Sequence, residues 1–187
     1  DEERTAKMEA YKTFIKEFGT PSEDFEQYIW AEISYSWALT LLTYGHAHGY
    51  YNKVTPEFFF FIHDIPLMNA KAIGNPTYRK YVEAYLNYTC MEKYPEEDEF
   101  FYQLDIAKKE GLVEEPLAYF KSNLLVKALK KHEGKDLVIE HYQKYLNKNE
   151  YEKYNKIVLD TYQEITRYGA GQYAQNFTLK DTSGRTV

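Results

Sequence analysis

Residues 20–44, TPSEDFEQYIWAEISYSWALTLLTY, decide the fold because they predict one long helix that is apolar on most of its sides. Thr20 is expected as the N-cap and Pro21 at the first helical position, and the acidic residues that follow suit the positive end of the helix dipole. Large apolar side chains then point in nearly every direction as far as Tyr44: Ile29, Trp30, Ile33, Tyr35, Trp37, Leu39, Leu41 and Leu42. Such a helix is expected at the centre of a helical array, with neighbours on several sides.

Amphipathic helices are predicted on both sides of this central helix. Residues 2–18 form the first, with an apolar stripe at spacings of three and four residues: Met8, Tyr11, Phe14, Ile15 and Phe18. Downstream, acidic residues at helix starts, basic residues at helix ends and glycine or proline at the breaks predict further helices with short connections. We therefore predict an all-α fold, an array of about eight antiparallel helices over residues 1–168.

The composition narrows the classes of function. A hydrophobic content of 44% in 187 residues is enough to build a buried core. The net charge of −6 and the absence of a basic block speak against nucleic-acid binding, which needs clustered positive charge. The densest apolar run, FFFFI at Phe58–Ile62, is far too short to cross a bilayer, so no transmembrane segment is expected.

Histidines offer the first candidates for chemistry. His46 and His48 lie two residues apart in GHAHG, where a loop or strand could let them chelate a metal, whereas on a helix their rings would diverge. No third ligand is in view, and His63 beside Asp64 is not thereby a hydrogen-bonded pair. We therefore predict no metal site. The sequence also lacks a glycine-rich phosphate loop and the common hydrolase motifs, so no cofactor is predicted.

Cysteine and tyrosine are both expected to serve packing. Cys90, the single cysteine, is predicted to be a small buried hydrophobe, because a reactive thiol needs a basic neighbourhood or a helix N-terminus. The 20 tyrosines suit shallow helix packing, in which the ring is buried and the hydroxyl reaches a polar partner. Exposed in a groove, the same rings would instead bind peptides or sugars.

The pattern changes after residue 168. GAGQ has the composition of a linker, and NFTLKD alternates Phe177 and Leu179 with polar residues, as a strand does. DTSG then suggests a turn, followed by a β-branched return in RTV. Since an isolated hairpin is marginal in water, residues 169–187 are predicted to be a linker and the β-like beginning of a second domain.

The last 17 residues, GQYAQNFTLKDTSGRTV, resemble the opening segment of thioredoxin-like domains of the TlpA and redoxin (AhpC/TSA) type. Seven residues fall at the positions of the family pattern: Gly171, Ala174, Phe177, Leu179, Asp181, Gly184 and Val187. Gln175 stands where the family usually has proline, and Arg185 where it commonly has lysine. The first departure removes a rigid kink and leaves the spacing intact.

This resemblance implies that the parent protein exchanges thiols and disulfides through a cysteine thiolate of low pKa. No Cys-x-x-Cys precedes Val187, so no catalytic residue carries over, and these residues alone are expected to be inactive. Related oxidoreductases often carry an extra N-terminal region and are exported, many as lipoproteins. The resemblance thus implies the periplasm or cell envelope, with lipid anchoring through residues before Asp1 as one form of attachment.

Residues 1–168 are accordingly expected to be an accessory helical domain that docks on, positions or dimerises the thioredoxin-like domain, or that selects substrate proteins with thiols or disulfides. Phe58–Phe61 is the candidate apolar patch for this role, and a place in the core is its alternative. Two rival hypotheses remain. One is a helical binding module for peptide or glycan without a redox role; the other is an enzyme complete in the helical body, built on His46, His48 or His63.

Overall fold

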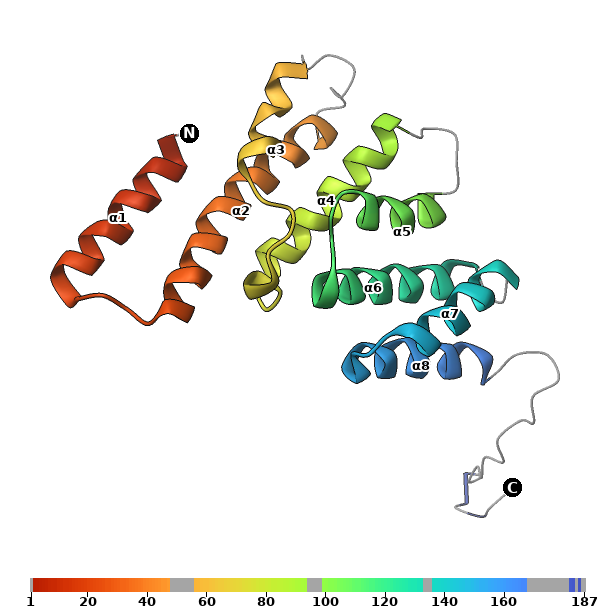
Figure 1. The fold of residues 1–187 in the computed structure, drawn as a ribbon. Helices are drawn as coiled ribbons and strands as arrows, with labels where there is room; N and C mark the ends of the chain where they lie inside the picture. Colours follow the sequence, from red (N-terminus) through yellow and green to blue (C-terminus); the bar gives the residue numbers. More distant parts are fainter. Residues whose placement is uncertain are drawn as a thin grey trace. The chain divides into compact units, whose positions relative to one another are not determined.

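The computed structural model describes residues 2–47, 56–93, 99–132 and 136–167, together with 182, 183 and 185. Within these ranges the chain is all-α, as predicted, and no residue is in a strand (Figure 1). The elements are α1 (Glu2–Phe18), α2 (Glu23–Ala47), η1 (Pro56–Phe60), α3 (Phe61–Asp64), η2 (Ala70–Ala72), α4 (Pro76–Lys93), α5 (Glu99–Lys109), α6 (Glu114–His132), α7 (Asp136–Lys148) and α8 (Glu152–Thr166), where η marks a 3₁₀-helix. Apart from residues 182, 183 and 185, the predicted β-like tail lies outside the described residues, as does the predicted boundary at residue 168.

The chain divides into two compact units, Asp1–Leu124 and Leu125–Val187, which we call unit 1 and unit 2. The division falls within α6. None of the helices in the described ranges is both long and apolar enough to span a membrane.

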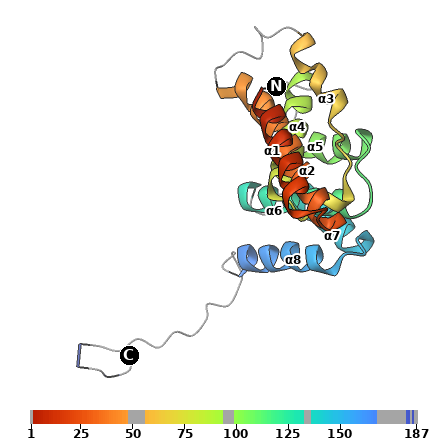
Figure 2. The same cartoon turned by 90° about the vertical axis from the view of Figure 1, so that its left-hand side faces the viewer.

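Unit 1 is built around α2, which lies between α1 and α4 (Figures 1 and 2). One face of α2 is fully buried at helical spacing: Ala31, Tyr35, Ala38 and Leu42. The facing residues of α4 are also buried: Tyr78, Tyr81, Val82 and Leu86. The prediction of a central, strongly apolar helix is therefore confirmed, and its most completely buried side is the side that meets α4.

The ends of α2 differ from the prediction. The helix begins at Glu23, because the Ser22 hydroxyl accepts a hydrogen bond from the Phe25 amide (N···O 3.4 Å) and so acts as the N-cap in place of Thr20. Pro21 lies before the helix instead of in its first turn. At the other end α2 runs to Ala47, beyond the predicted end at Tyr44. A glycine such as Gly45 costs a helix only about 1 kcal/mol and does not by itself end it.

The Phe-rich segment forms η1 and α3, and most of it belongs to the core. Phe59 and Phe61 are buried, Phe59 stacking on Tyr88 (ring centroids 4.5 Å apart) and Phe61 meeting Trp37 edge-on (5.5 Å). Phe60 alone points outward, with 59% of its surface exposed. The segment Phe58–Phe61 is thus largely part of the core, which confirms the alternative prediction and not the prediction of an apolar docking patch.

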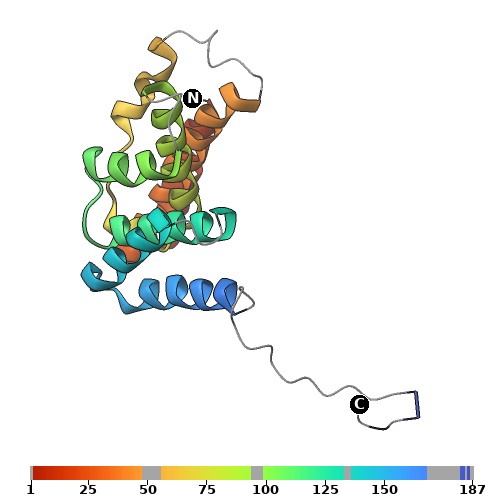
Figure 3. The ribbon, with the colours of Figure 1, turned by 90° about the vertical axis from the view of Figure 1, so that its right-hand side faces the viewer.

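Unit 2 contains the helical hairpin of α7 and α8, whose two helices pack on each other (Figure 3). Its buried residues recur at helical spacing on each helix: Val138, Tyr142 and Tyr145 on α7, and Tyr154, Val158 and Thr161 on α8. The rings of Tyr142 and Tyr162 stack with centroids 4.4 Å apart and planes inclined by 19°.

Candidate functional site

A cluster of three tyrosines occupies the centre of unit 1. Tyr35 comes from α2, and Tyr78 and Tyr81 come from α4; all three are 0% exposed. The Tyr35 ring centroid lies 4.8 Å from that of Tyr78 and 5.1 Å from that of Tyr81. The prediction that tyrosines serve packing is confirmed for these residues.

The three hydroxyls all donate to the irregular segment that follows α3. Tyr35 donates to the Pro66 carbonyl (2.9 Å), Tyr78 to the Leu67 carbonyl (2.8 Å) and Tyr81 to the Ile65 carbonyl (3.5 Å). Asn69 completes the set, because its side-chain Nδ2 donates to the Tyr35 hydroxyl and its backbone amide to the Tyr78 hydroxyl, each at 3.2 Å. We call this set, the three tyrosines with Ile65–Asn69, the tyrosine latch.

Burial keeps the latch neutral. It raises the pKa of Tyr35 to about 12 and moves the pKa values of Tyr78 and Tyr81 upward as well, since a phenolate would lose its hydration there. Near neutral pH every latch hydroxyl is therefore protonated and acts as a hydrogen-bond donor. The latch is suited to holding the Ile65–Asn69 segment in place and unsuited to acting as a general base.

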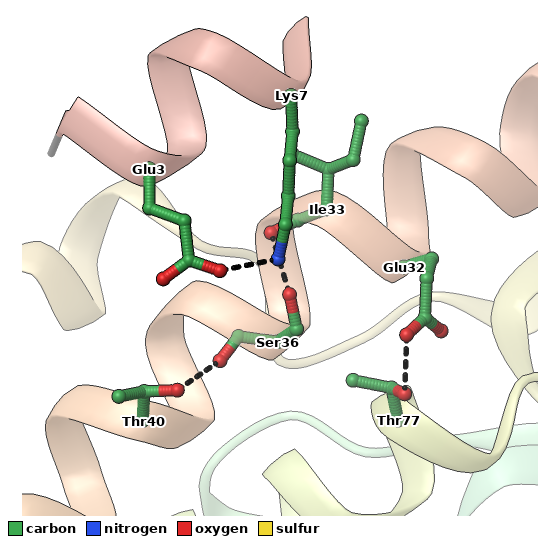
Figure 4. Close-up of polar contacts among 7 residues, drawn as sticks. All are labelled: Glu3, Lys7, Glu32, Ile33, Ser36, Thr40 and Thr77. Atoms are coloured by element: carbon green, nitrogen blue, oxygen red, sulfur yellow. Dashed lines mark hydrogen bonds and ion pairs between the residues drawn. The ribbon is translucent and has the colours of Figure 1, made fainter.

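A second, partly buried polar network begins α4, and Figure 4 shows one of its hydrogen bonds, from Thr77 to Glu32. Asn75 is 1% exposed, and its side-chain oxygen accepts from the amides of Thr77 (2.7 Å) and Tyr78 (3.1 Å), which makes it the N-cap. Glu32 of α2 accepts from Asn75 Nδ2 on one carboxylate oxygen (3.2 Å) and from the Thr77 hydroxyl on the other (3.0 Å). With both oxygens occupied at a helix N-terminus, Glu32 stabilises the start of α4 and joins it to α2.

Exposed aromatic rings flank the turn between α1 and α2. Phe14 and Phe18 come from the end of α1, and Phe25 and Tyr28 from the start of α2, with exposed fractions of 42%, 73%, 44% and 48%. The Phe14 and Phe18 rings lie 5.0 Å apart. We call these four residues the aromatic surface. The adjacent exposed rings of Phe14 and Phe18 make this end of the two helices a candidate docking site for another molecule.

The aromatic surface corrects the predicted stripe of α1. Sequence spacing grouped Phe14 and Phe18 with the residues that face the core, whereas the side of α1 that is partly buried carries Arg4, Met8, Tyr11 and Ile15. At the α-helical period, Phe14 and Phe18 lie about 70° from the centre of that side, at the edge of the predicted stripe, and only the neighbouring helix decides which edge is covered. Arg4 joins the inner side because its guanidinium stacks over the Trp37 ring, 4.7 Å from the centroid.

The histidines are not brought together by the described part of the structure. His46 is in the last turn of α2, and its side chain, like all of His48, lies outside the described residues. His63 and Asp64 are exposed on α3, and the His63 ring is 6.5 Å from that of Phe60. Among the described side chains no group of three His, Cys, Asp or Glu could hold a metal ion.

Cys90 lies on α4 and is 3% exposed, which confirms the prediction of a buried hydrophobe. A thiol in this position is shielded from disulfide substrates in solution.

The seven residues that carry the family resemblance all lie outside the described residues: Gly171, Ala174, Phe177, Leu179, Asp181, Gly184 and Val187. Their predicted strand and turn therefore stay predictions.

No protein-family model, curated protein or solved structure matches the chain. Function is consequently inferred from residues and geometry alone.

Proposed function

We propose that the helical body is a non-catalytic accessory module of a cell-envelope thiol–disulfide oxidoreductase of the TlpA-like type. The observation that carries the proposal is the spacing of the seven residues from Gly171 to Val187, which resembles the entry to a thioredoxin-like domain. In this arrangement the helices dock that domain, dimerise it or select its thiol-containing or disulfide-containing substrate proteins. The redox chemistry then belongs to a Cys-x-x-Cys outside these 187 residues.

Two features of the helical body support this division of labour. The one thiol of the chain, Cys90, is buried in the core, where it cannot reach and attack a protein disulfide unless the core opens. The aromatic surface, in contrast, is accessible and apolar, as a docking contact requires.

The first test is to read the encoding gene beyond the codon for Val187. An apolar strand followed by Cys-x-x-Cys is expected there. A stop codon in its place would refute the redox assignment, because nothing in the helical body could replace the missing cysteines.

A second test measures the chemistry directly. These 187 residues alone are expected to leave the disulfides of insulin intact in the presence of dithiothreitol, beyond the rate set by the reductant itself. Cys90→Ser is expected to behave identically. Reduction by the chain that disappears in Cys90→Ser would contradict the proposal, since it would make Cys90 the reactive thiol.

The alternative, a helical module that binds a peptide or glycan and has no redox role, is favoured by the aromatic surface. It predicts saturable binding of aromatic-rich peptides or oligosaccharides that is lost in Phe18→Ser. Phe60→Ser is the matched control, because Phe60 is comparably exposed and lies on a different element. Binding that survives both substitutions would exclude the aromatic surface as the binding site.

A further inference from the structure

Helix α1 is unusual among the long helices of unit 1 because it buries none of its residues. None of its 17 residues is buried, although α2 and α4, of similar or greater length, each contribute several fully buried side chains. An isolated helix of this length is marginal in water, and helices in proteins are stabilised chiefly by the apolar face they bury. The contact with α2 thus holds α1 with little apolar burial.

The polar contacts of α1 add little to that attachment. The Glu3–Lys7 ion pair (2.6 Å; Figure 4) is internal to α1. So is the hydrogen bond from the Thr13 hydroxyl to the Glu9 carbonyl (3.0 Å). Across the described residues, no side-chain hydrogen bond or ion pair joins α1 to α2. Arg4 stacks over Trp37, and this cation–π contact joins the two helices.

Tyr11 on α1 makes the packing of α1 against α2 less favourable in one respect. Its hydroxyl is buried and has no hydrogen-bond partner among the described residues. Burial, together with the nearby carboxylate of Glu26, raises the pKa of this hydroxyl. A buried hydroxyl without a partner costs free energy that is recovered when the group reaches water. If α1 moved away from α2, water could hydrate the Tyr11 hydroxyl.

The connection between the helices is a ready hinge. The chain leaves α1 at Gly19, which has a φ of +88° and whose amide donates to the Ile15 carbonyl (2.9 Å). A side chain at this φ would be strained, and a Cβ there would meet nothing within 4 Å. The turn is therefore determined by the backbone of residues 19–22 and not by packing around it.

We propose that α1 is a lid that opens from α2 as one unit about residues 19–22, while the rest of unit 1 stays folded. Opening uncovers the side of α2 that carries Ile33 and one face of Trp37, and leaves the tyrosine latch between α2 and α4 intact. This conformational device does not depend on the redox assignment.

Amide hydrogen exchange of the full chain, resolved by mass spectrometry, tests the lid. The amides of α1 are expected to exchange through a local opening that is nearly independent of low denaturant concentrations. The amides of α2 and α4 are expected to exchange through unfolding that depends strongly on denaturant. Equal denaturant dependence in α1 and α4 would overturn the proposal, since it would mean that α1 opens only with the whole unit.

Substitutions make the test specific. Tyr11→Phe removes the unpartnered hydroxyl and is expected to raise the protection of α1 amides about fivefold or more. The amides of α2 and α4 should be unchanged. Tyr28→Phe is the matched control, because the Tyr28 side chain is exposed, and it should change no helix.

Arg4→Ala removes the contact with Trp37 and is expected to lower α1 protection about two- to fivefold. Two results would refute the lid proposal. One is that Tyr11→Phe and Arg4→Ala change amide protection equally in all helices; the other is that neither changes the protection of α1 amides.

Discussion

The two units use tyrosine in different ways. In unit 1 the hydroxyls of Tyr35, Tyr78 and Tyr81 bond to backbone carbonyls of the irregular segment Ile65–Asn69. In unit 2 Tyr142 and Tyr162 contribute mainly their rings, stacked 4.4 Å apart between two regular helices. Within a helix, most backbone carbonyls accept hydrogen bonds from the helix itself, whereas carbonyls of an irregular segment need another donor. A buried tyrosine hydroxyl can supply that donor, so it stabilises an irregular segment more than a regular helix. The position of the hydroxyl's partner thus decides what each tyrosine contributes.

Unit 2 satisfies its own irregular backbone with amide side chains. In the turn between α7 and α8, Asn149 Nδ2 contacts the Tyr145 hydroxyl (3.0 Å), the Tyr151 carbonyl (3.2 Å) and Asn155 Oδ1 (2.7 Å). Asn155 Nδ2 donates in return to the Asn149 carbonyl (2.8 Å). All of these residues lie within ten positions of one another, whereas Tyr35 and Pro66 are 31 positions apart. The polar links of unit 2 are therefore local, and those of unit 1 are long-range.

The largest effect is expected from alkaline pH, which should weaken unit 1 first. Burial raises the pKa of Tyr35 from 10.0 to about 12 and also raises the pKa values of Tyr78 and Tyr81. The neutral hydroxyls therefore stabilise folded unit 1 in full below pH 10. This stabilisation is lost as the pH rises from 10 through the pKa values of the folded state. Each tyrosine contributes a slope of about 1.4 kcal/mol per pH unit in this window. Urea unfolding at pH 8, 10 and 11 measures it through tryptophan emission, which reports on unit 1 because Trp30 and Trp37 both lie in α2.

A constant urea midpoint from pH 8 to 11 would show that the latch hydroxyls ionise as readily in the folded state as in the unfolded state. Tyr35→Phe should show a shallower decline above pH 10, because one of the three ionisations is then missing.

Asn75→Ala is expected to lower the free energy of unfolding of unit 1 by about 2–4 kcal/mol. The substitution removes the N-cap of α4 and also leaves one oxygen of the Glu32 carboxylate without its partner. Asn75→Asp is an instructive control, because it can keep the cap but sets a second carboxylate against Glu32. If Asn75→Ala unfolds at the wild-type urea concentration, the network of Asn75, Thr77 and Glu32 does not stabilise the start of α4.

Tyr35→Phe is expected to cost about 1–3 kcal/mol, since it leaves the part-buried Pro66 carbonyl and Asn69 amide group without this partner. Tyr142→Phe in unit 2 is the matched comparison and is expected to cost less than about 0.5 kcal/mol, because the stacked ring is kept. Far-UV circular dichroism in urea, combined with hydrogen exchange of α4 and α8, separates the two units. Equal losses would erase the distinction between hydroxyl-based and ring-based tyrosines.

Asn149→Ala is expected to have the smallest effect that can still be measured in unit 2, about 1–2 kcal/mol. The contacts that its Nδ2 shares among three acceptors are only part-buried, so water can replace some of them. The loss should appear as faster exchange in α7 and α8, with α2 and α4 unaffected. A loss in α2 and α4 of the same size would mean that the two units unfold together.

Local signals accounted for most of the fold. The bounds predicted for the first helix, Glu2–Phe18, are those of α1, and Asn75 followed by Pro76 begins α4 as an N-cap followed by a proline should. The central place of residues 23–44 followed from their apolar circumference. The errors at the ends of α2 came from competition between neighbouring capping residues, Thr20 and Ser22, which composition alone cannot rank.

The candidate site was less predictable. Both the latch and the aromatic surface consist of residue types that the sequence contains in abundance, and nothing in their spacing distinguishes a buried ring from an exposed one. Phe14 and Phe18 were grouped with the core-facing stripe, although they are exposed. The donors of the latch gave no signal because their acceptors are backbone carbonyls, which every residue has.

The sequence by itself determined that this protein is helical, that α1 runs from Glu2 to Phe18 and that α2 lies at the centre, because propensity, capping and apolar periodicity act over a few neighbouring residues. Only the tertiary structure decided which tyrosines secure the Ile65–Asn69 segment, which phenylalanines stay in water and how lightly α1 is held. Those outcomes depend on contacts between positions such as Tyr35 and Pro66, or Arg4 and Trp37, which lie more than 30 residues apart along the chain. Such contacts arise from the packing of whole helices, which local sequence does not encode.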